Sequence, residues 1–92
     1  MMWTLTRERD GAGDRGKLLV LLQIDEDNQL QYYHPKDIHD LKVGWAVRVG
    51  AARATMFGAD TYWTTTYITE ILDSDETSIR FKTGNSIYTL KE

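Results

Sequence analysis

Apolar and polar side chains alternate in the second half of the chain. Residues 43–49 read VGWAVRV, with every second side chain apolar, and in residues 77–83 (TSIRFKT) Ile79 and Phe81 alternate with Arg80 and Lys82. This period of two is that of a β-strand with one buried face. Gly84-Asn85 predicts a tight turn, and residues 86–92 predict a last strand. We expect the apolar positions of the two alternating stretches to point inward: Val43, Trp45, Val47, Val49, Ile79 and Phe81.

Residues 61–72 (TYWTTTYITEIL) are dense in the β-branched and aromatic residues that favour strands. Their alternation is broken, because Ile68 and Ile71 lie three positions apart. Both side chains can face a core only if an extra residue bulges out between them. We therefore expect a β-bulge near Thr69–Glu70, which would bend the strand as a small barrel requires. Residues 51–60 predict a long loop before this strand, and residues 73–76 (DSDE) predict a turn after it.

The first half centres on an apolar run, residues 18–22 (LLVLL), followed by Ile24. The run is apolar on every side, so its periodicity does not separate strand from helix. Its short length and the acidic turn DEDN at 25–28 favour a hairpin of strands at 17–24 and 29–34. A helix over 17–26 is the alternative. We expect HPKDIHD (34–40) to connect the hairpin to the alternating half, with one helical turn after Pro35.

The N-terminal residues combine a possible short strand at 3–6 with a charged, glycine-rich stretch at 7–16. We interpret that stretch as a loop or mobile arm. A chain of 92 residues has room for one domain. The expected organisation is a mobile N-terminal arm and glycine loop at 1–16 and a single β-barrel domain at 17–92. The expected fold is mainly β, a small antiparallel barrel with an N-terminal hairpin.

Residues 11–16 read GAGDRG, which matches the dinucleotide-binding pattern G-x-G-x-x-G. Asp37 even lies at the distance where that pattern has an acidic residue. The pattern requires a buried strand before the glycines and a helix after them. The preceding TRERD is too charged for the strand, and the following KLLVLLQIDED is better interpreted as a strand than as a helix. We expect no nucleotide cofactor.

The segment 43–90 resembles the SH3-like barrel of Tudor domains. The residues that carry the resemblance are VGWAVRV at 43–49, YWTTTYITEI at 62–71 and IRFKTGNSIY at 79–88. The resemblance implies an SH3-like antiparallel barrel. The family commonly binds methylated lysine or arginine in an aromatic cage. Asn85 matches the family pattern, but Thr83 and Gly50-Ala51 stand where cage aromatics are expected, so the cage is not matched.

Charge and composition bear on whether the chain binds nucleic acid, spans a membrane or is cytoplasmic. The chain has 11 Lys and Arg against 14 Asp and Glu, a net charge of −3 without a block of either sign. Nucleic-acid binders usually carry a basic patch, and the linear sequence has none, so nucleic acid is only the alternative partner. It would be bound beside Tyr62 or Trp63 by cations that the fold brings together: Arg48, Arg53, Arg80 and Lys82. The apolar run 18–22 is too short to span a membrane. The absence of cysteine fits a cytoplasmic protein.

Two kinds of polar cluster are candidates for chemistry. His34 and His39 in HPKDIHD are ligand types that zinc accepts, but their spacing of five does not place them on one helix face, and we interpret the segment as a solvated connection. The acidic clusters 25–28 and 73–76 lack the glycine and distal glutamate of a calcium loop and are interpreted as hairpin turns. No nucleophile motif is present. We expect neither enzyme activity nor a metal site.

The aromatic pairs Tyr32-Tyr33 and Tyr62-Trp63 predict a binding surface, because a strand sends one member of each pair to each face. The expected function is a non-enzymatic binding or adaptor module that contacts another protein or a second copy of itself. The apolar segment 17–24 is the candidate for pairing between chains. The expected partner-binding residues are Arg48, Arg53, Met56, Phe57, Tyr62, Trp63, Arg80, Lys82 and Asn85.

Overall fold

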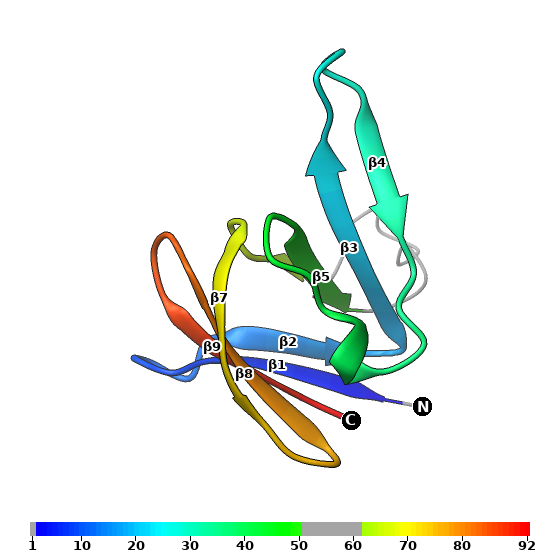
Figure 1. The fold of residues 1–92 in the computed structure, drawn as a ribbon. Coiled ribbons are helices and arrows are strands. Elements are labelled where there is room, and N and C mark those ends of the chain that lie inside the picture. Colours follow the sequence, from blue (N-terminus) through cyan, green and yellow to red (C-terminus); the bar gives the residue numbers. More distant parts are fainter. Residues whose placement is uncertain (1, 51–61) are drawn as a thin grey trace, which may run out of the picture.

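The computed structural model describes residues 2–50 and 62–92, which form two antiparallel β-sheets (Figure 1). The five-stranded sheet has the order β2-β1-β9-β8-β7, with strands at Trp3–Arg7 (β1), Gly13–Gly16 (β2), Ile68–Ser74 (β7), Ser78–Thr83 (β8) and Ile87–Lys91 (β9). The four-stranded sheet has the order β4-β3-β5-β6, with strands at Leu18–Ile24 (β3), Leu30–Tyr33 (β4), Ala46–Gly50 (β5) and Tyr62–Thr64 (β6). The expectation of a mainly β fold is confirmed.

The hydrophobic core draws on both sheets. Leu5 and Phe81 of the five-stranded sheet are fully buried, and so are Leu21 and Val47 of the four-stranded sheet. Ile38, in a short 3₁₀ helix (η1, Ile38–Asp40) between β4 and β5, is buried in the same cluster. Removal of this apolar surface from water is the main force that holds the two sheets together.

The short strand expected at 3–6 is confirmed as β1, and within the stretch 7–16, interpreted as a loop or mobile arm, Gly13–Gly16 forms β2, so that interpretation is wrong for these residues. β1 lies between β2 and β9 and contributes Trp3 and Leu5 to the core. The charged residues misled the sequence interpretation because β2, at the sheet edge, exposes Gly13 and Arg15 to solvent. A boundary at residue 16 therefore falls inside the fold.

The hairpin over 17–34 is confirmed as β3 and β4, and the helix alternative is excluded. The turn that joins the strands closes with Asn28 in the left-handed region, at φ 62°. β3 lies inside its sheet, where β4 pairs with Leu21–Ile24 and β5 pairs with Leu18–Leu22. The segment is therefore not the edge strand that the predicted pairing between chains requires.

The strand expected at 43–49 starts later. β5 begins at Ala46, and Val43 is 58% exposed instead of facing the core. Gly44 has a φ of 92°, and its N–H donates to the carbonyl oxygen of Ile68. The chain therefore turns at the glycine before the strand begins, which removes Val43 from the alternation. Val47 and Val49 do face the core, as expected.

The strand expected at 61–72 is two strands in different sheets. β6 ends at Thr64 in the four-stranded sheet, and β7 begins at Ile68 in the other. The bulge near Thr69–Glu70 is confirmed, because the register with β8 shifts between Ile68 and Glu70. A second shift follows between Ile71 and Asp73.

The remaining strands follow the expectation. β8 and β9 pair around the Gly84-Asn85 turn, with Ile79 and Phe81 buried. The helical turn after Pro35 is η1. Within the described part of the chain the strands form two sheets and not one closed ladder. No helix there is long and apolar enough to cross a membrane. The loop expected at 51–60 lies outside the described residues.

Candidate functional site

The four-stranded sheet has a second apolar surface on the side away from the core. Residues that pair directly across an antiparallel sheet point to the same side, and the pairs Leu22–Tyr32, Ile24–Leu30 and Leu22–Ala46 point away from the core residues Leu21 and Val47. We call this side the outer face. Its apolar members are Val20, Leu22, Ile24, Leu30, Tyr32 and Ala46.

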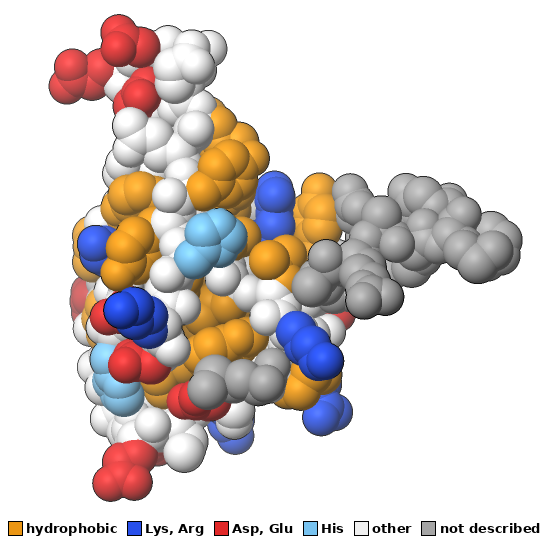
Figure 2. All heavy atoms as spheres, turned by 90° about the vertical axis from the view of Figure 1, so that its right-hand side faces the viewer, with side chains coloured by type: hydrophobic (Ala, Val, Ile, Leu, Met, Phe, Trp, Pro, Cys, Tyr) orange, Lys and Arg blue, Asp and Glu red, His pale blue; other side chains and the backbone are white. Residues whose placement is uncertain are grey.

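Three large apolar side chains of the outer face are open to solvent. Ile24 is 53% exposed, Leu30 is 50% exposed and Tyr32 is 55% exposed. They lie on the β3–β4 hairpin, which projects from the body of the molecule (Figure 1). Figure 2 shows hydrophobic side chains on this hairpin and acidic ones at its tip. Contiguous exposed apolar area of this kind is typical of interaction sites.

A shallow groove runs between the hairpin and the chain that leaves β6. Leu22 and Ala46 are buried in its floor, and Tyr67, which is 45% exposed, lies on its opposite rim. The groove is lined by Leu22, Gln23, Ile24, Leu30, Ala46, Arg48 and residues 64–67. Its mixture of aliphatic floor and threonine rim suits an apolar side chain of a partner, with hydroxyl groups at the border.

Among residues 2–50 and 62–92, Arg48 is the cation that lines this groove. Its Nε donates to Oγ1 of Thr64 over 2.9 Å, and its guanidinium carbon lies 4.3 Å from the ring centroid of Tyr62. Two of the expected site residues, Arg48 and Tyr62, are thus brought together. The ring holds the guanidinium against the sheet, so the charge remains next to the apolar surface.

The two aromatic pairs divide between opposite faces of their strands, as expected. Tyr32 and Tyr62 point outward and are 55% and 41% exposed. Tyr33 and Trp63 point inward, where both pack against the core. Trp63 is therefore not on the outer face beside Tyr62.

Trp63 instead borders a polar hollow that shares Thr64 and Thr66 with the groove of the outer face. Arg7 lies over the Trp63 ring, 5.0 Å from its centroid, and Asn85 and Arg9 line the same hollow. Lys82 and Asn85 line a neighbouring hollow. Three of the expected site residues, Trp63, Lys82 and Asn85, thus line these two hollows, whereas Arg48 lines the groove of the outer face.

The proposed basic patch is not assembled among the described cations. Arg48 lies on the four-stranded sheet, whereas Arg80 and Lys82 lie on β8 of the other sheet. Arg80 binds the carboxylates of Glu8 and Asp73 at 3.0 and 3.2 Å, which neutralise its charge. Arg53, Met56 and Phe57 lie outside the described residues.

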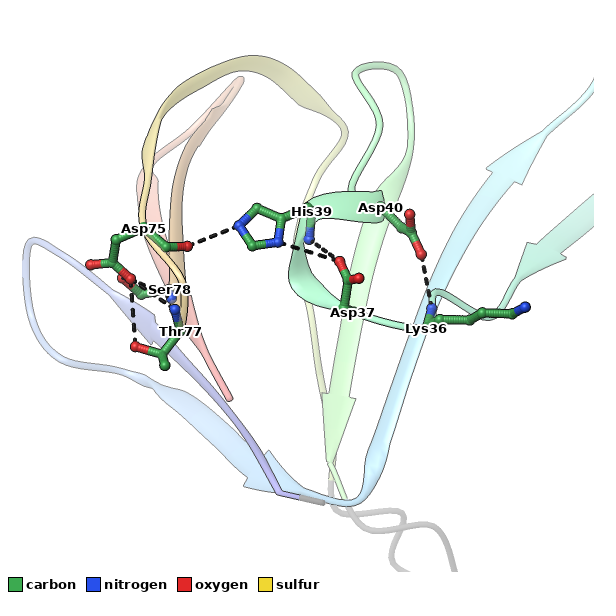
Figure 3. A network of polar contacts seen from close by, with 7 residues as sticks. All are labelled: Lys36, Asp37, His39, Asp40, Asp75, Thr77 and Ser78. Atoms are coloured by element: carbon green, nitrogen blue, oxygen red, sulfur yellow. Dashed lines mark hydrogen bonds and ion pairs between the residues drawn. The ribbon is translucent and has the colours of Figure 1, made fainter.

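The polar residues of HPKDIHD have structural roles (Figure 3). Asp37 caps η1 by accepting from the His39 N–H, and Asp40 accepts from the Lys36 N–H. Nε2 of His39 lies 2.8 Å from the carbonyl oxygen of Asp75, which links η1 to the β7–β8 turn. Within the described chain no three His, Cys, Asp or Glu side chains gather into a metal site.

The cluster 25–28 is a hairpin turn, as expected, whereas in the cluster 73–76 Asp73 and Ser74 belong to β7 and the turn begins at Asp75. Asp25 accepts from the backbone N–H groups of Asp27 and Gln29, and Asp75 accepts from those of Thr77 and Ser78. These hydrogen bonds hold the pKa of each carboxyl below its ordinary value. The two aspartates are therefore ionised turn-forming groups.

The glycines of GAGDRG form a β-hairpin instead of a nucleotide loop. Gly11 has a φ of 73° in the β1–β2 turn. Gly13 pairs with Thr6, and a Cβ at Gly13 would collide with the carbonyl oxygen of Leu5. The segment after Gly16 is β3 and not a helix, so the motif has no helix N-terminus to hold a phosphate.

Comparisons with protein-family models, curated proteins and solved structures find no match to this chain. The proposal for function therefore rests on the described residues.

The sequence alone did not identify the residues that make the outer face apolar and exposed. Ile24, Leu30 and Tyr32 share a face only through the β3–β4 register. The signal was present: the run 18–24 is apolar at both parities, which indicates a strand with two apolar sides. Tyr67 was missed because its segment was interpreted as strand.

Proposed function

We propose that this protein is a non-enzymatic binding module that contacts another protein through the outer face of its four-stranded sheet. The observation that carries the proposal is the half-exposure of Ile24, Leu30 and Tyr32 beside an apolar groove. Burial of such side chains favours association by roughly 25 cal/mol for each Å² of apolar area removed from water. Arg48, held by Tyr62, adds a positive charge that favours a partner with a carboxylate.

We further propose that residues 41–92 form an SH3-like, Tudor-like barrel, with β1 to β4 as additions to it. The bulges in β7 support this, because small barrels bend their strands at bulges. The passage of one chain segment from β6 in one sheet to β7 in the other also supports it. An experimental structure in which β5 to β9 superpose on an SH3-like domain would support this proposal, and one in which these strands have a different connectivity would contradict it.

The function is tested by affinity capture from lysate of the source organism. Tyr67→Glu places a charge on the groove rim, outside the strands, and we expect it to abolish capture of the partner. Lys82→Glu changes an exposed residue on the other sheet and serves as the control. Capture that both variants retain, or that wild type does not show, would overturn the proposal.

Nucleic acid is the alternative partner, and the same experiment distinguishes it. Treatment with nuclease abolishes capture if RNA or DNA is bound, and Lys82→Glu then weakens it. Binding of nucleic acid also falls steeply with salt, because phosphate contacts release counterions. Capture that resists nuclease and salt supports a protein partner at the outer face.

A further inference from the structure

β4 is an edge strand whose backbone is ready to pair. In the described structure β4 pairs only with β3, so its other side is free. The Asp25 N–H donates to the Gln29 carbonyl oxygen at the start of this ladder. Hydrogen-bonded and non-hydrogen-bonded pairs alternate along an antiparallel ladder, so Gln31 bonds to β3, whereas Leu30 and Tyr32 direct their N–H and C=O groups to the free side.

The same two residues carry the exposed apolar side chains of this strand. Leu30 is 50% exposed and Tyr32 is 55% exposed, both on the outer face. An incoming strand that bonds to their backbone would also cover their side chains. Edge strands of natural proteins are usually protected by charges or proline, and the sequence of β4, LQYY, contains neither.

We propose that β4 pairs antiparallel with β4 of a second copy of this chain, with Gln31 opposite Gln31. This inference rests on the proposed function, since it names a second copy as a protein bound at the edge of the outer face. In this register Leu30 of each copy faces Tyr32 of the other. Every free backbone group of these two residues then has a partner, and the two outer faces continue as one apolar surface.

Charge selects the antiparallel direction. The tip of the β3–β4 hairpin carries Asp25, Glu26 and Asp27, while exposed His34 and Lys36 follow β4. Antiparallel pairing separates the two acidic tips and carries each toward residues 34–40 of the other copy, where Lys36 lies beside Asp37 and Asp40. Parallel pairing would set the two acidic tips side by side, where like charges repel. A second copy thus matches this edge in its backbone hydrogen-bonding groups, and the antiparallel direction keeps the two acidic tips apart.

Single cysteines test the register directly, because the natural chain contains none. Opposed residues of a non-hydrogen-bonded pair have Cα atoms about 4.5 Å apart, within the range that a disulfide spans. We expect Gln31→Cys to form a disulfide-linked dimer under mild oxidation. Gln29→Cys is the matched control, since Gln29 of one copy would face Tyr33 of the other and not itself. Equal cross-linking of the two variants, or none in Gln31→Cys, would overturn the proposal.

The oligomeric state provides the second measurement. Light scattering on the unmodified full chain should give twice the chain mass at high concentration. Tyr32→Pro removes an N–H that points to the free side and leaves the ladder to β3 intact, so the folded variant should be a monomer. A monomeric wild type contradicts self-pairing. The proposed function is tested separately, because Tyr67→Glu alters the groove and not the β4 edge. If the wild type is a monomer but captures a different protein, and Tyr67→Glu abolishes that capture, the proposed function is supported and self-pairing is not.

Discussion

The indole Nε1 of Trp63 donates a hydrogen bond to the hydroxyl oxygen of Tyr88 over 3.2 Å. Trp63 belongs to β6 in the four-stranded sheet, and Tyr88 belongs to β9 in the five-stranded sheet. This contact therefore joins the two sheets by a polar bond beside the core, where Tyr88 also stacks on Phe81 with ring centroids 5.7 Å apart.

Removal of either partner of this bond should weaken the contact between the sheets. We expect Tyr88→Phe to lower the free energy of unfolding by about 1 kcal/mol, because the half-buried indole N–H loses its acceptor. Denaturant unfolding followed by circular dichroism of Tyr88→Phe, Trp63→Phe and the double variant measures the coupling. Strictly additive effects would show that the bond contributes nothing.

Thr65 lies where the chain passes from one sheet to the other. Its side chain is buried, its Oγ1 accepts from the Val47 N–H over 3.0 Å, and the same hydroxyl donates to the Thr66 carbonyl oxygen over 2.7 Å. Thr65→Val keeps the shape but leaves the Val47 N–H unpaired, so we expect a loss of about 1–3 kcal/mol in the free energy of unfolding. Thr65→Ser keeps the hydroxyl and should lose less. An equal loss in both would contradict the role of the hydroxyl.

Gly13 tests the structural role of the glycine motif. We expect Gly13→Ala to destabilise the fold by about 1–3 kcal/mol, because the new methyl group would overlap the carbonyl oxygen of Leu5. Gly84→Ala is the matched control, since a Cβ there meets no heavy atom within 4 Å. Thermal unfolding of the two variants should separate them clearly. Similar melting temperatures would refute the close approach of β1 to β2.

Asp10 makes stability depend on acid pH. Hydrogen bonds from Arg7 lower the pKa of Asp10 from 3.8 to about 2. A carboxyl with a depressed folded-state pKa stabilises the fold above pH 3.8, and this contribution disappears as the pH falls toward about 2. Asp10→Asn should therefore unfold more easily than wild type at pH 7 and equally easily at pH 2. A constant difference across this range would contradict the ion pair, and Arg7→Met should reproduce the effect of Asp10→Asn on the pH profile.

The local sequence pattern was sufficient to predict strands and turns where the turn residues and the alternation of apolar residues agree. The strands around Gly84-Asn85 and the turns at Asp25 and Asp75 follow from side-chain chemistry within a few residues. The bulge followed from the spacing of Ile68 and Ile71, because the period of a strand cannot place both inward. Where a glycine changed the direction of the chain, as Gly44 does, the alternation was misleading at Val43.

The partner-binding residues expected from composition were divided by the fold. Arg48 and Tyr62 lie together on the outer face, whereas Trp63 and Asn85 border a different hollow. A list of aromatic and basic residues carries no information about which sheet each strand joins. Residue type could identify candidate binding residues, but only strand pairing determined which of them lie on the same surface.

The sequence by itself determined that this chain is built of short strands, because alternation, β-branched residues and turn residues act over a few positions. Only the tertiary structure decided that β1 joins the core and that the apolar run 18–24 has one side in the core and the other on the outer face. The physical reason is that a run apolar at both parities has no preferred inner side. Pairing of this run with β4 and β5 determines which of its side chains are buried in the core.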